Sequence, residues 1–355
     1  MQQRCTVAML FGGQSAEHEV SIQSALNVHA ALEAAGYEII RVGIDRQGVW
    51  RLAPAIGAID PAWPTVAMLS GGGGEIAVLD GDQCALKADV VFPVLHGPRA
   101  EDGSLQRLLK LANVAFVGPG ILASALCMDK EFSKYMLQAA DIPTVKTLSF
   151  GRSNAVGYAD AVRELGSPLF VKPANMGSSV GVSKVHSEAA YTEALESAFT
   201  FDTKAVVESY AEGQKIECGV LSLDSLQASV PGEIVPTSND GFYSYDAKYI
   251  DESGAKLVFP ANLPDDQARK VQEMSVAAAR ALGCEGMVRV DFFLKSNGEL
   301  LVNELNTIPG FTAISMYPKL WEVSGISPES LVVHLIEHAL NRFRQESALI
   351  SSHQG

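Results

Sequence analysis

Strand-like and helix-like segments alternate through the first third of the chain, and this pattern limits the possible folds more than any other feature. Apolar runs typical of buried strands cover Cys5–Phe11, Glu38–Ile44 and Val90–Leu95, and amphipathic helix patterns such as Glu19–Ala35 separate them. A helix between consecutive strands lets the strands pair in parallel, with helices covering the faces of the sheet. We therefore expect a doubly wound α/β domain at the N-terminus.

Later segments change character, and a length of 355 residues is typical of two or three domains. We predict an α/β domain over residues 1–128, a smaller α+β domain over residues 129–219 and a C-terminal domain over residues 220–355. Segment 236–260 is rich in aromatic, charged and glycine residues and has no clear period. Stretches of this length without secondary structure are often lids, so we predict a mobile loop there.

The chain is acidic, with 27 Lys and Arg against 41 Asp and Glu and a formal charge of −14. Such a surface repels nucleic-acid phosphates and anionic lipids, so we expect neither as a partner. No segment resembles a signal peptide or a membrane span, and the five cysteines lie singly. We expect a cytoplasmic protein in which a local cluster of cations holds any anionic ligand.

Two strand patterns near the C-terminus, Val288–Leu294 and Glu299–Asn306, flank the dipeptide Asn297-Gly298. This dipeptide is a preferred two-residue turn of tight hairpins. A turn formed by those two residues places Asp291 directly opposite Glu304, with both side chains on the polar face of the hairpin.

Carboxylates that face each other across two strands repel unless a cation lies between them. On the same face the predicted register places Arg289 opposite Asn306, which adds a third oxygen to those of Asp291 and Glu304. Hard divalent cations prefer oxygen ligands of this kind. We predict a magnesium site on this face, with a solvated hairpin as the alternative.

A second candidate site follows the apolar segment Leu169–Pro173, where Gly177–Gly181 reads Gly-Ser-Ser-Val-Gly. Glycines let backbone amides approach an anion, and a glycine loop between two strands is typical of a flap that closes over phosphates. Lys130, Lys172 and Lys248 lie at element boundaries or in loops, and together they would supply the positive charge that a nucleoside triphosphate needs.

Short blocks spread over nearly the whole chain combine into a specific signature. They are Phe11–Ser21, His96-Gly97, Glu101–Gly103, Cys127–Lys130, Val171–Pro173, Gly177–Gly181, Tyr245–Tyr249, Arg289–Asp291, Asn303–Thr307 and Pro309-Gly310. On these blocks the chain resembles the D-alanine–D-alanine ligases of the ATP-grasp superfamily. The resemblance implies a three-domain ATP-grasp architecture and the ATP-dependent joining of two D-alanines through D-alanyl phosphate, a step in peptidoglycan precursor synthesis.

The same resemblance implies the cofactors and a role for particular residues. ATP would be bound by Lys130, Lys172, Ser179, Glu208 and Lys248. Two Mg²⁺, with Mn²⁺ as a possible substitute, would be held by Asp291, Glu304 and Asn306. Family members are also homodimers, so a homodimer is expected.

For the amino-acid substrates, the resemblance implies that Glu17 and His96 bind the ammonium group of the first D-alanine and that Ser315 binds the carboxylate of the second. Arg289 and the backbone N–H of Gly310 would stabilise the oxyanion formed during attack by the second amine. A hydrogen-bonded triad of Glu17, Ser178 and Tyr249 would close the site against water.

One residue matches the family and another departs from it. A tyrosine at position 249 implies an amine acceptor, and therefore a dipeptide product rather than a depsipeptide. Lys215 stands where relatives usually carry a carboxylate that binds ribose. Glu212 or Glu217 could replace that carboxylate, and the choice is open.

Two motifs suggest other functions. His334-Leu335-Ile336-Glu337-His338 matches an inverted zinc-peptidase motif, so a metalloprotease that uses His334 and His338 is the alternative from another class. Gly118-Pro119-Gly120 follows a strand and imitates a dinucleotide fingerprint, which suggests an NAD-binding module as a third hypothesis.

Overall fold

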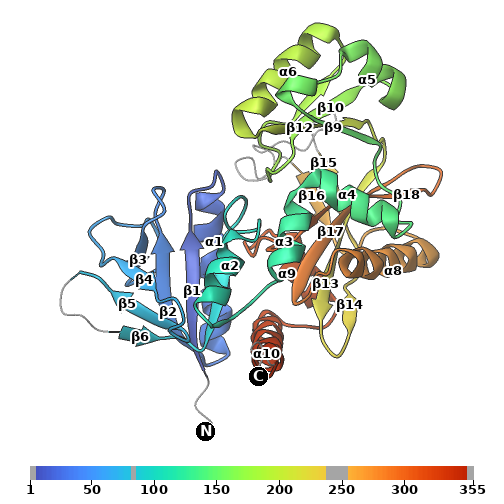
Figure 1. The fold of residues 1–355 in the computed structure, drawn as a ribbon. Coiled ribbons are helices and arrows are strands. Elements are labelled where there is room, and N and C mark those ends of the chain that lie inside the picture. The colour runs from blue at the N-terminus through green and yellow to red at the C-terminus, as the bar shows by residue number, and fades with distance from the viewer. Residues whose placement is uncertain (1–4, 81–84, 237–254, 350–355) are drawn as a thin grey trace, which may run out of the picture.

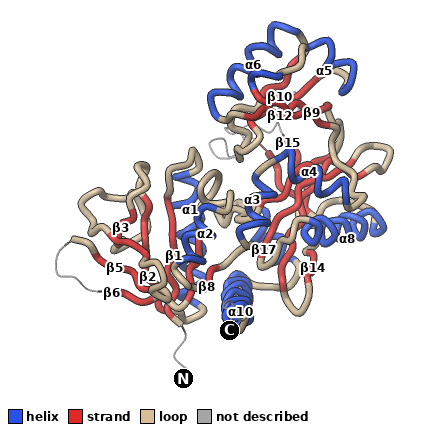
Figure 2. The backbone as a smooth tube through the Cα atoms, in the orientation of Figure 1, coloured by secondary structure: helices blue, strands red, loops and turns tan. Residues whose placement is uncertain are grey.

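A computed structural model gives the architecture of residues 5–80, 85–236 and 255–349. Three groups of strands, each with its own helices, follow one another along the chain (Figures 1 and 2). The predicted mobile loop falls largely outside these residues, and so do Lys248 and Tyr249. Within the described residues no helix combines the length and the apolar character needed to cross a bilayer.

The N-terminal group is a five-stranded sheet in the order β3-β2-β1-β7-β8. Neighbouring strands pair in parallel except for β3 at one edge. The elements are β1 (Thr6–Gly12), α1 (His18–Ala34), β2 (Glu38–Ile44), β3 (Trp50–Leu52), β7 (Val90–Val94), α2 (Ser104–Leu111) and β8 (Ala115–Phe116). A small antiparallel sheet lies beside it, made of β4 (Val66–Met68), β5 (Glu75–Val78) and β6 (Ala85–Lys87). The predicted parallel α/β sheet is confirmed.

Alternation along β1 explains why both faces of this sheet are buried. Val7, Met9 and Phe11 belong to a core shared with α1 and with α10 (Pro328–Ser347), whereas Ala8 and Leu10 face a core shared with α2. The last helix of the chain therefore covers the first sheet. Helix α10 contacts α1, β7 and β8, so elements from near both ends of the chain pack together.

The central group is an antiparallel sheet in the order β11-β10-β12-β9, covered by two helices and forming its own apolar core. Its elements are β9 (Thr147–Gly151), a 3₁₀ turn η1 (Arg152–Asn154), α5 (Tyr158–Leu165), β10 (Leu169–Pro173), β11 (Ser183–Val185), α6 (Glu188–Phe201) and β12 (Lys204–Ser209). This is the expected small α+β unit.

The C-terminal group is built on the sheet order β16-β15-β13-β17-β18, with β14 paired to β13. Its elements are α3 (Ile121–Met128), α4 (Lys130–Ala139), β13 (Gln214–Ser222), β14 (Leu226–Ala228), β15 (Gly232–Pro236), β16 (Ala255–Val258), α8 (Asp265–Ala281), β17 (Met287–Leu294), β18 (Leu300–Asn306) and α9 (Met316–Val323). Strand β13 starts before residue 220, and α3 and α4 contribute to the same core. The predicted domain limits at 128 and 219 stay a prediction.

Part of the segment 236–260 differs from expectation. Residues Ala255–Val258 were expected in a loop without secondary structure, but they form β16 and pair with β15 in antiparallel register, with Lys256 opposite Val235. Pairing with an existing sheet edge stabilises a strand that shows no clear period in its own sequence.

The hairpin of β17 and β18 has the predicted register at its polar candidate site residues. Asp291 lies opposite Glu304 and Arg289 lies opposite Asn306. The other face of β17 carries Val288 and Val290, both buried in the core of the C-terminal group.

The predicted two-residue turn is wrong, and a bulge compensates for the difference. Lys295 pairs with Glu299, so the loop has three residues, and Gly298 at its end has φ of +83°. Three-residue hairpin loops commonly combine a type I turn with a left-handed residue, and Gly298 has the conformation expected of the latter. Between Asp291 and Phe292 the register shifts by one, so Phe292 faces Val302 and Asn303 is the extra residue. The one-residue shift from the longer turn and the one-residue shift from the bulge cancel, so Glu304 has its predicted partner.

We expect Gly298→Ala to lower the free energy of unfolding by about 1–2 kcal/mol, because alanine is strained at this positive φ. An added Cβ would lie 3.2 Å from Gln267 Nε2, the end of a side chain that can move away, so the cost is in the backbone. Urea unfolding of the purified variant measures it. Ser296→Ala in the same turn is the control, and equal stability of both variants would contradict the three-residue turn.

Candidate active site

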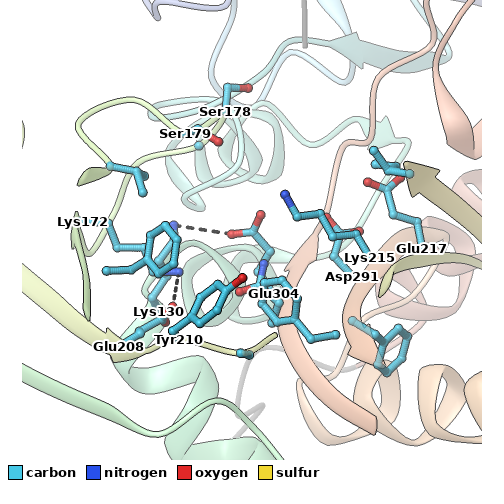
Figure 3. Close-up of a pocket in the computed structure, with 18 of the residues that line it drawn as sticks. Lys130, Lys172, Ser178, Ser179, Glu208, Tyr210, Lys215, Glu217, Asp291 and Glu304 are labelled. Carbon is cyan, nitrogen blue, oxygen red and sulfur yellow. Dashed lines mark ion pairs between the residues drawn. The ribbon is translucent and has the colours of Figure 1, made fainter. Parts of the chain in front are cut away.

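The predicted site residues within the described part of the chain gather around two adjoining cavities. The first cavity is lined by Lys130, Lys172, Ser179, Glu208, Asp291 and Glu304, with Phe170, Tyr210, Lys215, Ile216 and Phe292 (Figure 3). The second is lined by Glu17, His96, Glu101, Arg289, Asn306, Gly310 and Ser315. The two cavities share a wall, because five residues line both of them: Gly177, Ser178, Glu217, Ile234 and Glu304.

One part of the first cavity is apolar and shaped by rings. The rings of Phe170 and Tyr210 lie 6.0 Å apart with planes tilted by 30°, and Ile216 and Phe292 belong to the same wall. Glu208, on β12, adds a carboxylate beside these rings (Figure 3). A flat aromatic base with a hydrogen-bond donor at its edge fits such a surface.

The start of α4 places a lysine in the first cavity. The Asp129 carboxylate accepts hydrogen bonds from the backbone N–H groups of Glu131 and Phe132, which caps the helix. Lys204 Nζ, 2.7 Å from Asp129 Oδ2, ties this cap to β12. The next residue, Lys130, is buried, donates to the carbonyl of Met176, and has its Nζ 3.8 Å from Glu304 Oε2.

Two lysines hold the buried carboxylate of Glu208. Lys172 Nζ lies 2.6 Å from Oε2, and Lys134 Nζ donates to Oε1. Burial alone would raise the pKa of Glu208, but the two ammonium groups outweigh it and lower that pKa to about 2. Glu208 is therefore a carboxylate at neutral pH. The sequence indicated Lys172, whereas Lys134 was missed. Its position four residues after Lys130 could have revealed it, because residues one helical turn apart lie on the same face of a helix.

The glycine loop bends over both cavities. Ser178 and Ser179 adopt left-handed conformations, with φ of 51° and 61°. The backbone N–H of Asn175 donates to Asp202 Oδ2 at 2.7 Å, which anchors the start of the loop. Ser178 Oγ donates to Glu17 Oε1, so the loop contacts the N-terminal domain. Two members of the predicted triad are thus in contact, and the third, Tyr249, lies outside the described residues.

The polar face of the β17–β18 hairpin carries oxygen atoms that fit a divalent cation. Asp291 and Glu304 face each other, and Asn306 Nδ2 lies 3.0 Å from Asp291 Oδ2 on the same face. All three are half-buried in a cavity wall. Within the described ranges, no set of three or more His, Cys, Asp or Glu side chains converges as a metal site, so the amide of Asn306 is needed for a third ligand.

Arg289 is fixed between two carboxylates. Its Nε lies 2.7 Å from Asp291 Oδ1 and 3.0 Å from Glu217 Oε2, and its Nη2 lies 2.8 Å from Asp291 Oδ2. Glu217 lies opposite Asp291 on the neighbouring strand β13. Glu217 is buried and lines the first cavity, but its carboxylate already forms an ion pair with Arg289. Glu212 is exposed and does not line that cavity. The ribose contact stays open, with Lys215 in the wall of the first cavity.

In the second cavity the ring of His96 connects the N-terminal domain to the loop after β18. His96 Nδ1 lies 3.0 Å from the carbonyl of Ile308, and Nε2 lies 3.2 Å from Ser24 Oγ, which accepts the N–H of Phe311. Burial lowers the pKa of His96, so the ring is neutral near pH 7. Contact between His96 and a substrate stays a prediction.

Glu101 makes a similar connection, and the sequence indicates no role for it beyond its place in a motif. Its Oε2 accepts the N–H of Gly97 at 2.8 Å and its Oε1 accepts the N–H of Ile308 at 2.9 Å. Burial, with a further contribution from the nearby Glu17, raises the pKa of Glu101 to about 8. The side chain therefore holds Pro309-Gly310 beside the cavity while it is uncharged at neutral pH.

Ser315 lies at the end of the loop that follows β18 and binds the backbone of that loop. Its Oγ accepts the N–H of Thr312 at 2.9 Å, and a Cβ added to Gly310 would approach that Oγ to 2.8 Å. A side chain at position 310 would therefore displace the Ser315 hydroxyl from its place beside Thr312. Gly310 and Ser315 are neighbours, as their predicted roles require.

Comparison with known proteins places this geometry in a family. The family model described as the D-ala D-ala ligase N-terminus matches residues 6–119, and that of the D-ala D-ala ligase C-terminus matches residues 136–337. The chain belongs to the D-alanine–D-alanine ligase family. The predicted mixed α/β ATP-grasp fold agrees with this membership.

Individual relatives match almost end to end. A D-alanine–D-alanine ligase from Shouchella clausii is 46% identical over 360 residues, which cover 98% of this chain and 97% of that protein. D-alanine–D-alanine ligase A from Escherichia coli K12 is 46% identical over 361 residues, 98% of this chain and 99% of that protein.

Solved structures agree with the family assignment. The D-alanine-D-alanine ligase from Coxiella burnetii has a TM-score of 0.87 and 36% identity, covering 97% of this chain and 96% of that chain. The VanG D-Ala:D-Ser ligase from Enterococcus faecalis has a TM-score of 0.83 and 34% identity, covering 95% of this chain and all of that chain.

The two alternative functions have no support in this family. His334 and His338 lie on α10, whose Leu335 and Ile336 pack into the core, and no third zinc ligand joins them among the described residues. The metalloprotease hypothesis therefore has no support. The carbonyl of Gly118 accepts a hydrogen bond from Arg342 Nη1 at 2.8 Å, so the turn of the proposed dinucleotide motif packs against the C-terminal helix.

The environment of Glu101 predicts how stability changes with pH. Because its pKa is about 8 in the folded protein and near 4.5 when unfolded, the unfolded chain loses this proton first as pH rises. This contribution to stability is complete below pH 4.5 and declines between about pH 4.5 and 8. Glu101→Gln removes the titration, so its unfolding free energy should decline less over that range.

Urea denaturation at several pH values measures how steeply the unfolding free energy of the wild type and of Glu101→Gln declines with pH. The exposed Glu38→Gln is the control and should keep the wild-type slope, since the comparison concerns slopes and not absolute stability. Parallel curves for wild type and Glu101→Gln would show that Glu101 is ionised in the folded protein.

Proposed function

We propose that this chain joins two D-alanines to D-alanyl-D-alanine, with hydrolysis of ATP to ADP and phosphate, for peptidoglycan precursor synthesis. The observation that carries the proposal is the shared wall of the two cavities, to which Gly177, Ser178 and Glu304 contribute together with Glu217 and Ile234. A phosphate chain along the first cavity would end at this wall, opposite a carboxylate held in the second.

The first cavity suits ATP. The rings of Phe170 and Tyr210 would take the adenine, whose amino group would donate to Glu208, and the amides and hydroxyls of Gly177–Gly181 would cover the phosphates. Lys130 and Lys172 would neutralise phosphate charge, together with Lys248 as the resemblance implies.

The polar face of the hairpin suits the metal. Asp291, Glu304 and Asn306 would hold two Mg²⁺, or Mn²⁺ in their place, and the bound metal would neutralise charge on the transferring phosphoryl group. In-line phosphoryl transfer needs mainly positioning and charge stabilisation, which agrees with a site of lysines and carboxylates without a nucleophilic side chain.

The second cavity would bind both amino acids. Glu17 would pair with the ammonium group of the first D-alanine, whose carboxylate would attack the γ-phosphate at the shared wall and become D-alanyl phosphate. Ser315 would bind the carboxylate of the second D-alanine. Its amine would then attack the acyl carbon, and phosphate would leave.

Negative charge on the carbonyl oxygen during this attack would be stabilised by Arg289 and the backbone N–H of Gly310. The two carboxylates around Arg289 fix the direction of its guanidinium, and Glu101 and His96 hold the loop that carries Gly310. Ser178, bound to Glu17, would exclude water from the acyl phosphate, with Tyr249 as the third member of the triad.

We further propose that the enzyme is a homodimer of the cytoplasm, where ATP and both amino-acid substrates are available, and that nucleic acids and membranes are not partners. The formal charge of −14 supports the last point.

Release of ADP in the presence of Mg-ATP and D-alanine tests the proposal. We expect turnover with D-alanine, D-alanyl-D-alanine as the product, and none with L-alanine, because the cavity is chiral and Glu17 fixes the ammonium group. D-lactate offered as the acceptor should give little depsipeptide at neutral pH. Equal turnover with both enantiomers, or none with D-alanine, would refute the function.

Asp291→Asn tests the metal site separately. Loss of one carboxylate should lower kcat by about 100-fold or more and raise the Mg²⁺ concentration needed for half-maximal rate, since a neutral amide binds a hard cation weakly. Asp266→Asn, exposed on the first turn of α8, is the matched control and should behave as wild type. Unchanged Mg²⁺ dependence in Asp291→Asn would remove Asp291 from the metal site.

A further inference from the structure

Lys134 lies behind the wall of the first cavity and is not part of its lining. It is 2% exposed, among the most buried charged residues of the described chain. Taking an ammonium group out of water is costly unless strong hydrogen bonds replace the lost hydration. The partners of Lys134 therefore indicate why the residue is there.

The ammonium group of Lys134 has three acceptors. It donates to Glu208 Oε1, to Thr147 Oγ1 at 2.7 Å and, at the longer distance of 3.5 Å, to the carbonyl of Val145. Thr147 Oγ1 donates its own hydrogen bond to the carbonyl of Val145 at 2.9 Å, which leaves its lone pairs to accept from the lysine. Thr147 lies opposite Glu208 in the register of β9 and β12. The ammonium group thus bridges two adjacent strands.

This bridge fixes one oxygen of Glu208, while Lys172 binds the other. With one lysine on each oxygen, the carboxylate cannot rotate without breaking a charged hydrogen bond. A buried glutamate without such partners becomes protonated, and a carboxylic acid can donate a hydrogen bond as well as accept one. Only the ionised form is restricted to accepting.

We propose that Lys134 is a positioning residue that makes the nucleotide site select a purine with an amino group at position 6. By holding Glu208 ionised and fixed, Lys134 keeps an obligatory acceptor beside the base. A 6-amino group donates to that acceptor, whereas a 6-oxo group would place an oxygen against a carboxylate. Sites built around a buried hydrogen-bonding group reject analogues that cannot satisfy it.

The proposal deepens the proposed function, from which it takes ATP as the ligand, but it is tested by binding alone. ATP and inosine triphosphate form a matched pair, since inosine differs from adenosine only in a 6-oxo group, with a proton on N1, in place of the 6-amino group. Calorimetric titration of the full-length protein with each nucleotide and Mg²⁺, without D-alanine, gives the selectivity ratio. An inactive ligase that binds ATP selectively would contradict the proposed function and leave this inference intact.

We expect the wild type to bind ATP at least 10-fold more tightly than inosine triphosphate. In Lys134→Met the ratio should fall to within about threefold, with weaker binding of ATP as the main change. Lys146→Met, an exposed lysine next to Thr147, is the matched control and should keep the wild-type ratio. Equal weakening of both nucleotides, or an unchanged ratio in Lys134→Met, would overturn the proposal, because a purely structural role does not distinguish the two bases.

A double-mutant cycle with Glu208→Gln checks that Lys134 acts through Glu208. Glu208→Gln should reduce the selectivity ratio by itself, and adding Lys134→Met should change the ratio no further. Additive losses in the double variant would mean that Lys134 acts by another route and would overturn the proposal.

Thr147→Val gives a milder test if Lys134→Met unfolds. It removes one acceptor of the Lys134 ammonium group while keeping the side-chain shape. The selectivity ratio should fall in the same direction by a smaller factor, whereas an unchanged ratio in a folded Thr147→Val protein would count against the proposal.

Discussion

Two carboxylates held directly opposite each other on neighbouring strands are the constraint on which the rest of the site depends. Asp291 and Glu304 would repel in water and repel more strongly in a half-buried wall, where the effective dielectric constant is lower. The surrounding residues reduce this repulsion. Arg289 binds Asp291 through two nitrogens, Asn306 donates to it, and Lys130 approaches Glu304. A site arranged in this way can accept a cation without moving its backbone.

Contacts between domains extend this arrangement to the reacting groups. The loop of β10 and β11 reaches Glu17 through Ser178, and the loop after β18 is held from the N-terminal side by Glu101 and His96. Helix α10, at the other end of the chain, completes the core under the first sheet. The second cavity is therefore bounded by residues of the N- and C-terminal groups together with Gly177 and Ser178 of the glycine loop.

Local pattern was sufficient to predict the alternating strands, the facing acids of the hairpin and the glycine flap. The hairpin also shows the limit of such reasoning. A two-residue turn was expected at Asn297-Gly298, and the observed three-residue turn would have displaced every pair if Asn303 were not a bulge. Bulges depend on twist and packing against neighbouring strands, which no local pattern reports. Lys134 and Glu101 were missed as functional residues for a related reason. Their partners lie far away in sequence, and only tertiary structure shows that Lys134 meets Glu208 and that Glu101 meets Ile308.

Charge balance explains how an acidic chain can bind a polyanion. Each of the cations Lys130, Lys134, Lys172 and Arg289 lies against a carboxylate, drawn from Glu208, Glu217, Asp291 and Glu304. The four positive and four negative groups of these pairs balance one another, which limits the cost of burying them. In the proposed complex, phosphates and a divalent cation would add opposite charges together, so the lysines would turn to phosphate while the acids would turn to metal. Lys134 is the exception, because it lies outside the cavity lining with Thr147 as its second anchor. Since this lysine cannot follow the phosphates, Glu208 keeps a cation in every state of the site, and the carboxylate beside the base stays ionised while its neighbours exchange partners.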